Sequence, residues 1–221
     1  MRKRMRAHAG ARMWWSCGRL LPLLIVASLP LGLCAAEARA QGSPRRGEPS
    51  LSAGGDARPT RAWSEFCRRM PAECAVDPAE PTAIELTPST WRLIVAVNRR
   101  VNRTILSLPD RQHWGVEDRW DYPADGVGDC EDIQIAKRKL LIEAGLPRRA
   151  LRMTVVVDEK GEGHAVLMVR TQEGEFILDN RRDAVLPWHR TGYVYVMREG
   201  DHGATWVSLG RRGSPVVTAK R

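Results

Sequence analysis

The chain has 221 residues, which is enough for one domain with a substantial core and additional terminal segments. Its formal net charge is +9, but residues 1–40 contain seven of the 35 basic residues and one of the 26 acidic residues. The remaining chain therefore carries a net charge of only +3 and has no basic stripe with interleaved aromatic residues. This distribution argues against a nucleic-acid-binding protein.

Residues 1–40 have the pattern of a secretory signal peptide. A basic start is followed by an apolar run, Leu20 to Leu33, and then by Ala38-Arg39-Ala40, which matches a small-residue cleavage site. The run contains two prolines and is shorter than the ~20 apolar residues of a membrane-spanning helix. We expect a mature chain that begins at Gln41, is periplasmic or secreted, and has no stable membrane insertion. The alternative is an uncleaved anchor.

Three cysteines remain after this leader. Cys67 and Cys74 lie seven residues apart, and in an oxidising compartment they could close a small disulfide loop. Cys130 is then a leftover thiol, which in an exported protein is a candidate reactive cysteine. Its polar and acidic neighbours argue against the alternative, a cysteine that acts only as a small buried hydrophobic residue.

The start of the mature chain lacks apolar periodicity. Residues 41–62 are rich in Gly, Ser, Pro and Arg, which predicts a flexible linker before a domain over residues 63–210. Residues 63–86 hold the cysteine loop and several prolines, so we expect irregular structure packed on the domain. Residues 211–221 are expected to form a disordered tail.

Apolar residues at helical spacing predict a first long helix, which begins near Thr87-Pro88-Ser89 and ends at Pro109-Asp110. Asn98 and Asn102 lie off its apolar stripe, which indicates solvent-facing positions.

An aromatic-rich loop follows over residues 110–128, directly before the candidate nucleophile. Binding residues concentrate on loops that a rigid scaffold holds in place. Trp114, Asp118 and Trp120 are therefore candidate substrate-binding residues. The alternative is that the two tryptophans only cover the core.

A second helix is predicted from Cys130 to Ala144, with Gly145 as its C-cap. Acidic residues at its start and basic residues toward its end, among them Lys137 and Arg138, complement the helix dipole.

After Pro147 the period changes from helical to extended. Five strands are predicted, over Leu151–Val157, His164–Thr171, Glu175–Asn180, Tyr193–Arg198 and Trp206–Leu209. Helices followed by a run of antiparallel strands indicate an α+β fold.

Cys130 has the position of an activated nucleophile, because the N-terminus of a helix lowers the pKa of a thiol there. A histidine that takes the thiol proton and a carboxylate that orients the histidine would complete the site. His164 and Asp179 are the candidates, and alternation along their strands places both on one face. Asn180 could replace Asp179 but should point to the opposite face.

The hairpin register decides whether His164 and Asp179 meet. A two-residue turn at Glu173-Gly174 pairs Asp179 with Met168, roughly 13 Å from His164 along the strand. A turn centred one residue earlier pairs Asp179 with Val166, diagonal to His164 and within side-chain reach. A Cys-His-Asp site therefore requires the earlier turn or a bulge.

Asp129, Glu131 and Asp132 flank Cys130, and their negative charges should raise the pKa of its thiol. Either they point into solvent or a cation neutralises them. Closely spaced carboxylates are ligands of the kind that Ca²⁺ prefers, whereas helix capping explains the same acids without a metal. No EF-hand loop and no zinc-type cysteine spacing is present.

Taken together, several motifs of the chain resemble the bacterial transglutaminase-like cysteine peptidases, including the LapG-like periplasmic proteases. They are Gly128-Asp129-Cys130-Glu131-Asp132 with Lys137, Gly145-Leu146, Leu151-Arg152, His164-Ala165-Val166-Leu167 and Leu178-Asp179-Asn180, with Phe66-Cys67…Cys74 and the Trp114–Pro123 run upstream. The resemblance covers roughly residues 63–200.

The resemblance implies a papain-like or transglutaminase-like core, with the nucleophile helix packed on an antiparallel sheet. It implies Cys130 as nucleophile, His164 as base and Asp179 as orienting acid. It also implies Ca²⁺ at Asp129 and Glu131, with Asp132 as a further ligand, because the acids that flank the nucleophile bind calcium in LapG-like relatives that clip adhesins from the cell surface.

We therefore expect a monomeric, exported cysteine protease that acts on a protein substrate, such as a surface adhesin. The backbone N–H of Cys130 should be one oxyanion donor. The second donor stays open, with the loop from Trp114 to Asp125 as its candidate source. The alternatives are a transglutaminase or deamidase that acts on protein glutamine, and a non-catalytic binding module of the same fold.

Overall fold

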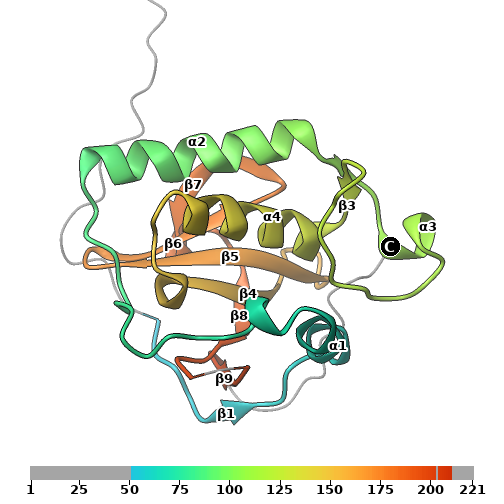
Figure 1. Ribbon diagram of the computed structural model, residues 1–221, viewed down its shortest axis with the longest axis horizontal. Helices are drawn as coiled ribbons and strands as arrows, with labels where there is room; N and C mark the ends of the chain where they lie inside the picture. The colour runs from blue at the N-terminus through green and yellow to red at the C-terminus, as the bar shows by residue number, and fades with distance from the viewer. Residues whose placement is uncertain (1–50, 203, 211–221) are drawn as a thin grey trace, which may run out of the picture. The chain divides into compact units, whose positions relative to one another are not determined.

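The computed structural model describes residues 51–202 and 204–210 (Figure 1). The expected leader, residues 41–50 of the expected linker, and the expected tail lie outside these residues. None of the described helices is long and apolar enough to cross a bilayer.

A seven-stranded sheet, in which all neighbouring strands are antiparallel, has the strand order β1-β9-β8-β4-β5-β6-β7. Its strands are β1 (Asp56–Ala57), β4 (Leu151–Val157), β5 (Gly163–Thr171), β6 (Gly174–Asp179), β7 (Arg182–Pro187), β8 (Val194–Glu199) and β9 (Trp206–Ser208). A separate parallel pair consists of β2 (Leu106–Ser107) and β3 (Val127–Gly128). All five predicted strands are present, and β7 is a strand that the sequence did not predict.

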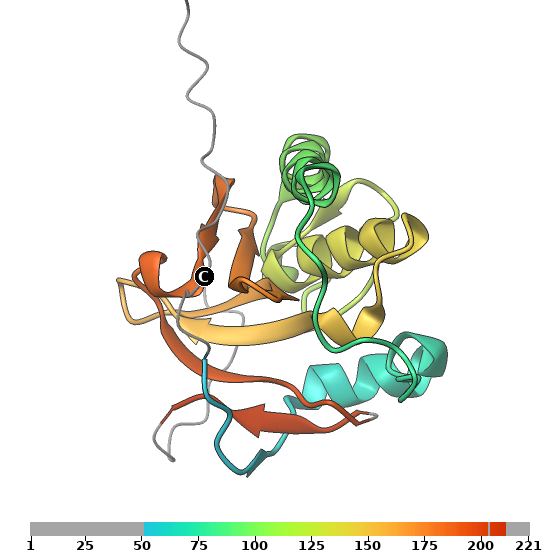
Figure 2. The same cartoon turned by 90° about the vertical axis from the view of Figure 1, so that its left-hand side faces the viewer.

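The helices are α1 (Arg61–Arg69), α2 (Pro88–Thr104), α3 (Asp110–His113) and α4 (Cys130–Glu143), with 3₁₀ turns at Pro71–Glu73, Arg148–Ala150 and Trp188–Arg190. Figure 2 shows α1, α2 and α4 on one side of the sheet. The predicted α+β architecture, with the nucleophile helix packed on an antiparallel sheet, is confirmed.

The central strands are buried on both faces. Leu167 and Val169 of β5 belong to the main core with the helices, whereas Val166 and Met168 belong to a smaller cluster. Because side chains alternate along a strand, these two clusters mark opposite faces of the sheet. The strands that carry His164 and Asp179 are therefore held firmly on both sides.

Helix α2 begins where the Thr87 side chain accepts a hydrogen bond from the backbone N–H of Thr90. The expectation that Asn98 and Asn102 face solvent is wrong. Asn98 is fully buried and donates to the carbonyl of Arg182, and Asn102 donates to the carbonyl of Asp179 at 3.0 Å. These contacts arise because α2 packs on β7.

Helix α4 is buried on more sides than its sequence pattern indicated, because it packs against both the sheet and α2 (Figure 1). Gly145 has φ +92°, as expected for its C-cap position. Lys137 and Arg138 are fully buried rather than solvated. The Nζ of Lys137 has no hydrogen-bond partner among the described residues, and burial lowers the pKa of this amine to about 7.

Regular structure starts earlier than expected. The expected linker contains β1, which pairs with β9, and α1 begins at Arg61 within it. The expectation of irregular structure from residue 63 is also wrong for the helical residues of α1. Trp63 and Phe66 are fully buried, and this apolar face docks the helix onto the main core.

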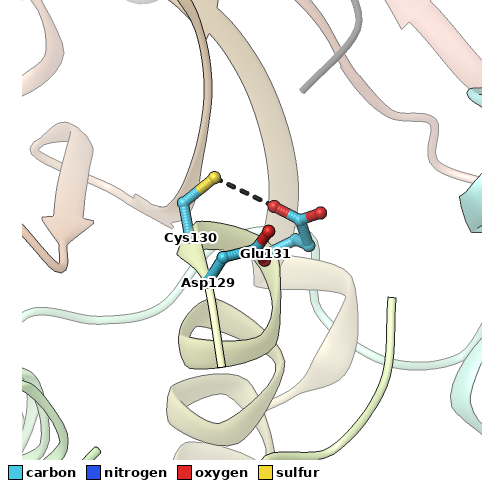
Figure 3. Close-up of side chains that lie close together, drawn as sticks. All are labelled: Asp129, Cys130 and Glu131. Carbon is cyan, nitrogen blue, oxygen red and sulfur yellow. Dashed lines mark hydrogen bonds between the residues drawn. The ribbon is translucent and has the colours of Figure 1, made fainter. Parts of the chain in front are cut away.

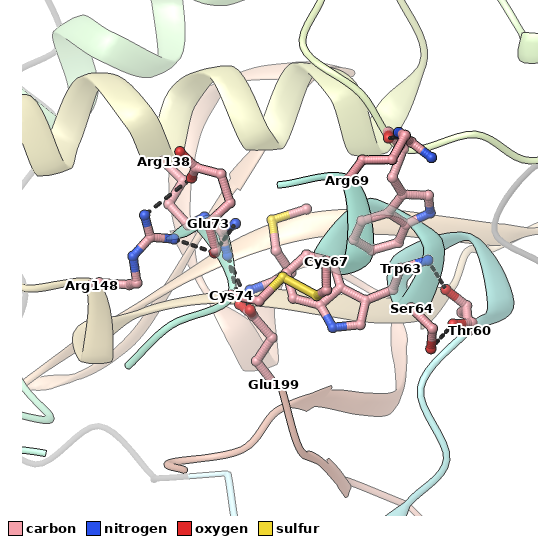
Figure 4. The surroundings of a disulfide bond; sticks show 12 residues. Thr60, Trp63, Ser64, Cys67, Arg69, Glu73, Cys74, Arg138, Arg148 and Glu199 are labelled. Carbon is pink, nitrogen blue, oxygen red and sulfur yellow. Dashed lines mark hydrogen bonds and ion pairs between the residues drawn. A yellow bond between two sulfur atoms is a disulfide. The ribbon is translucent and has the colours of Figure 1, made fainter. Parts of the chain in front are cut away.

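The predicted disulfide is present between Cys67 and Cys74, whose Cα atoms lie 5.5 Å apart (Figure 4). Its loop is attached to α4 because Arg138 donates hydrogen bonds both to the carbonyl of Glu73 and to the carboxylate of Glu199 on β8. The disulfide loop therefore helps to hold helix α4 against the sheet.

Candidate active site

Cys130 is the first residue of α4, and Asp129 is its N-cap. The approach to this position requires a glycine at 128, because a Cβ atom there would lie 2.8 Å from the Cβ of Asp132 and 3.1 Å from the Cβ of Pro123. The chain thus enters α4 in close packing with the preceding loop. Cys130 is half-buried and is the one cysteine outside a disulfide in the part of the chain that the structure describes.

The hairpin between β5 and β6 has the register that a Cys-His-Asp site requires. Leu167 pairs with Leu178 and Thr171 with Gly174, so Asp179 lies opposite Val166. The turn is therefore centred one residue before Glu173-Gly174. The Nε2 of His164 lies 2.9 Å from the Oδ1 of Asp179, and both side chains are buried.

The thiol lies next to this pair. The backbone N–H of Ala165, the residue after His164, donates to the Sγ of Cys130 at 3.4 Å. The Nδ1 of His164 is buried and has no hydrogen-bond partner among the described residues. The structure thus brings Cys130, His164 and Asp179 together at the point where α4 meets β5.

Two opposite electrostatic effects act on these groups. Burial, followed by the negative charges of Glu131 and Asp129, raises the pKa of the Cys130 thiol. Burial alone would also raise the pKa of Asp179, but the hydrogen bonds from His164 and Tyr193 outweigh it and lower this pKa to about 2. Asp179 is therefore ionised at neutral pH, whereas burial and the acidic neighbours both favour the protonated thiol.

The acidic residues around Cys130 are turned toward one another rather than into solvent. Figure 3 shows the Cys130 Sγ directed at the Glu131 carboxylate, to which it donates a hydrogen bond at 2.9 Å, with the Asp129 side chain beside them. Two more aspartates, Asp110 and Asp118, complete what we call the acidic cluster. Its members are Asp110, Asp118, Asp129, Glu131 and Asp132. Their ligand atoms form three overlapping sets, one of which also includes the Cys130 sulfur, and within each set all atoms lie within 4.8 Å of one another.

The acidic cluster has the chemistry of a cation site. Asp110, Asp129 and Glu131 each have a buried carboxylate oxygen without a hydrogen-bond partner among the described residues. Burial together with mutual repulsion raises the pKa of Asp129 and Glu131, and it raises that of Asp132 to about 9. Clustered carboxylate oxygens that lack donors fit a hard divalent cation such as Ca²⁺.

The two candidate substrate-binding tryptophans differ in their exposure to solvent. Trp120 is fully buried and packs edge-on against Trp63 and Trp206, with ring centroids 5.2 and 6.2 Å away. Its assignment to a cleft wall is therefore wrong, and the alternative of core packing holds. Trp114 is 42% exposed and stacks with Arg119, so it remains available at the surface.

Replacing Trp120 with alanine is expected to destabilise the domain by about 3–5 kcal/mol, because it leaves a large cavity between two other tryptophans. Urea unfolding followed by circular dichroism measures this change. Trp114→Ala is the matched control and should alter the free energy of unfolding by less than about 1 kcal/mol. Equal stability of the two variants would contradict the placement of Trp120 in the core.

Asp118 lies at the acidic cluster rather than beside an open surface, and its Oδ1 accepts a hydrogen bond from the indole N–H of Trp120 at 3.0 Å. His113 pairs with Asp125 at 2.9 Å within the same loop. His189 is exposed next to Trp188, and neither histidine takes the place that His164 has beside Cys130.

Sequence reasoning missed three residues of the site. Asp110 was taken as the end of a helix, but it is fully buried in the acidic cluster. Asn102 holds the backbone of Asp179, and Tyr193 donates to its carboxylate. The polar side chain of Asn102 one turn after Asn98 was the available indication, because two asparagines at this spacing lie on one helix face.

A cysteine at a helix N-terminus beside a histidine–aspartate pair on an antiparallel sheet is the arrangement of a cysteine hydrolase with a transglutaminase-like core. The sequence model of the bacterial transglutaminase-like cysteine proteinase family, BTLCP, matches residues 53–214. The chain belongs to this family and is a cysteine peptidase of the transglutaminase-like type.

Among solved structures, calcium-bound LapG from Legionella pneumophila is similar, with 26% identity over 59% of this chain and 75% of that chain and a TM-score of 0.47. Two further structures of the same LapG, one of them EGTA-treated, each show 26% identity over 56% of this chain and 69% of theirs, with a TM-score of 0.45. Comparison with curated proteins gave no match.

Proposed function

We propose that the protein is an exported protease in which Cys130, His164 and Asp179 act as a catalytic triad. The observation that carries this proposal is the 2.9 Å contact between His164 and Asp179, together with the N–H of Ala165 on the Cys130 sulfur. This arrangement supports the assignment of a nucleophile, a base and an orienting acid in the order that acyl transfer requires.

In the proposed reaction, the Sγ of Cys130 attacks the carbonyl carbon of a peptide bond and its proton passes to His164. Since Asp179 occupies Nε2, the free Nδ1 is the atom that exchanges this proton. His164 then protonates the departing amine as the C–N bond breaks, which leaves a thioester on Cys130. A water molecule, deprotonated by His164, attacks the thioester and releases the acid.

The oxyanion that forms in each step needs a donor near the sulfur. Cys130 supplies one, because the N–H of the first residue of a helix has no partner within that helix. The Ala165 N–H points at the sulfur and favours the thiolate over the thiol.

We further propose that the acidic cluster holds Ca²⁺. The buried carboxylate oxygens of Asp110, Asp129 and Glu131 that lack donors fit this ion. The proposed ligands are Asp129, Glu131 and Asp132, with Asp110 and Asp118 beside them. A bound Ca²⁺ supplies the positive charge that offsets these carboxylates. The matched LapG structure is described as calcium-bound, which supports the same assignment here.

The proposed substrate is a protein of the cell envelope, such as a surface adhesin, and the proposed location is the periplasm or the exterior. The leader pattern in residues 1–40 and the disulfide between Cys67 and Cys74 support export, because such bonds persist in oxidising compartments.

The deciding experiment compares proteins shed by cells that carry the natural chain with those shed by cells that carry Cys130→Ala. A protein released only by the natural chain, with a new terminus, is the expected result and identifies the substrate. The purified chain is then incubated with that protein and a labelled primary amine. Amine incorporation without chain cleavage would replace the protease with a transglutaminase, and an identical set of shed proteins would refute release from the envelope.

A further inference from the structure

The carboxylate of Asp179 has a second side-chain partner besides His164. Its Oδ1 accepts from the Nε2 of His164 at 2.9 Å and from the backbone N–H of Arg181 at 3.0 Å. Its Oδ2 accepts from the hydroxyl of Tyr193 at 2.5 Å. With Oδ1 and Oδ2 tied to different groups, the carboxylate cannot rotate without breaking at least one of these bonds.

Tyr193 also contacts the histidine itself. Its ring meets the His164 ring edge to face, with centroids 5.7 Å apart and planes at 77°. On the tyrosine ring lies the guanidinium of Arg182, 5.3 Å from the centroid. Tyr193 is buried, so the tyrosine shields the His164–Asp179 pair from water and limits the orientations open to the imidazole.

The chain fixes Tyr193 in this place just before β8. Its backbone N–H donates to the hydroxyl of Thr191, and that hydroxyl also meets the hydroxyl of Tyr195 at 3.0 Å. Gly192, between them, has φ +79°, a backbone conformation that favours glycine. A defined turn therefore presents the phenol to the carboxylate.

Other charged side chains that the structure describes near Asp179 do not donate a hydrogen bond to its carboxylate. Lys137 of α4 acts on it only through its charge and has no hydrogen-bond partner among the described residues. Arg182 of β7 donates to Glu159 at 2.6 Å. The phenol of Tyr193 is thus the side-chain donor that shares Asp179 with His164.

We infer that Tyr193 is a positioning residue of the proposed triad, which acts through Asp179 to set the orientation and the basicity of His164. The inference rests on the proposed function, because the reaction that Tyr193 would assist is the proposed proteolysis. Because the phenol takes part of the negative charge of Asp179, its removal leaves more of that charge to stabilise the imidazolium form of His164.

The test is the Tyr193→Phe variant, which keeps the ring on His164 and Arg182 but removes the donor. In NMR spectra recorded at one pH, the ring signals of His164 should shift relative to those of the natural chain. Cleavage of the identified substrate should slow by about 10-fold in kcat, with an alkaline limit shifted upward. Tyr195→Phe is the comparison variant, because its hydroxyl contacts Thr191 and not Asp179, and it should change both quantities clearly less than Tyr193→Phe does.

A double-mutant cycle with Asp179→Asn separates positioning from a general effect on the fold. If Tyr193 acts through Asp179, adding Tyr193→Phe to Asp179→Asn should change kcat by less than about twofold. An unchanged His164 ring signal in Tyr193→Phe would overturn the inference, as would full additivity in the cycle. If Tyr193→Phe shifts this signal but the natural chain cleaves no protein, the inference stands and the proposed protease is refuted instead.

Discussion

Cys130→Ala is expected to abolish proteolysis, with a loss of at least about 10⁴-fold in kcat, because the proposed reaction has no nucleophile without the sulfur. Thermal unfolding should be nearly unchanged, since alanine is a good helix former at the start of α4. His164→Ala should lose activity to a similar extent, because members of such a triad act as a unit. The measurement is the rate of cleavage of the shed envelope protein.

A substrate-free version of this prediction uses the alkylation rate of Cys130 by iodoacetamide in the presence of Ca²⁺. His164→Ala should slow this reaction near neutral pH and give it the pH dependence of an ordinary thiol, because the imidazolium no longer favours the thiolate. His189→Ala, an exposed histidine outside the site, is the control and should react like the natural chain. Equal rates for all three proteins would rule out His164 as the partner of the thiol.

Removing calcium is expected to lower the thermal stability of the domain substantially. At a free concentration of about 1,000 times its Kd, a bound ion stabilises the native state by about 4 kcal/mol. For a domain of this size, that corresponds to a difference of about 10 °C in Tm between protein with Ca²⁺ and protein with chelator. Differential scanning calorimetry measures this difference in Tm. Identical Tm values under the two conditions would contradict calcium binding at the acidic cluster.

The calcium effect should grow with pH. Without a cation, Asp132 has a native pKa of about 9 against an ordinary value of 3.8, and the pKa values of Asp129 and Glu131 are also raised. The native state therefore holds protons that the unfolded chain has released, so stability falls as pH rises from about 4 toward 9. A bound cation requires the deprotonated carboxylates, so the difference in Tm should widen over the same range.

Removing a carboxylate of the acidic cluster should change Tm in opposite directions with Ca²⁺ and with chelator. Glu131→Gln should lower Tm when Ca²⁺ is present, because a ligand is lost, and raise it in chelator, because a buried acid is removed from its repelling neighbours. Glu85→Gln, an exposed acid outside the cluster, should shift Tm by little in either condition. A Glu131→Gln variant with the same calcium response as the natural chain would exclude this carboxylate as a ligand.

The parts of the fold that sequence analysis predicted well depend on local patterns. The bounds of α4 and β4 follow from a C-cap glycine and from a short run rich in apolar and β-branched residues, and the structure has them within one residue. The choice between the two hairpin registers was left open, because alternation along strands fixes the face of a side chain but not its partner. In the structure, Thr171 pairs with Gly174, and this register brings His164 and Asp179 together.

The parts that were missed depend on how distant segments pack. Strand β7 is short and begins with charged residues, so its sequence has no apolar alternation that predicts a strand. The burial of Asn98 against this strand was therefore unexpected. Asp110 joins the acidic cluster only because the long loop after α3 returns to the start of α4. Trp120 shows the same limit, since its burial depends on Trp63 and Trp206 from opposite ends of the domain.

The disulfide between Cys67 and Cys74 has a practical consequence for the study of this protein. With these two sulfurs bonded to each other, Cys130 is the one remaining thiol among the described residues. A thiol-reactive dye or spin label added to the oxidised chain without residues 1–40 would mark Cys130 alone. Counting and following functional sites would then need no engineered cysteine and no cysteine-free background.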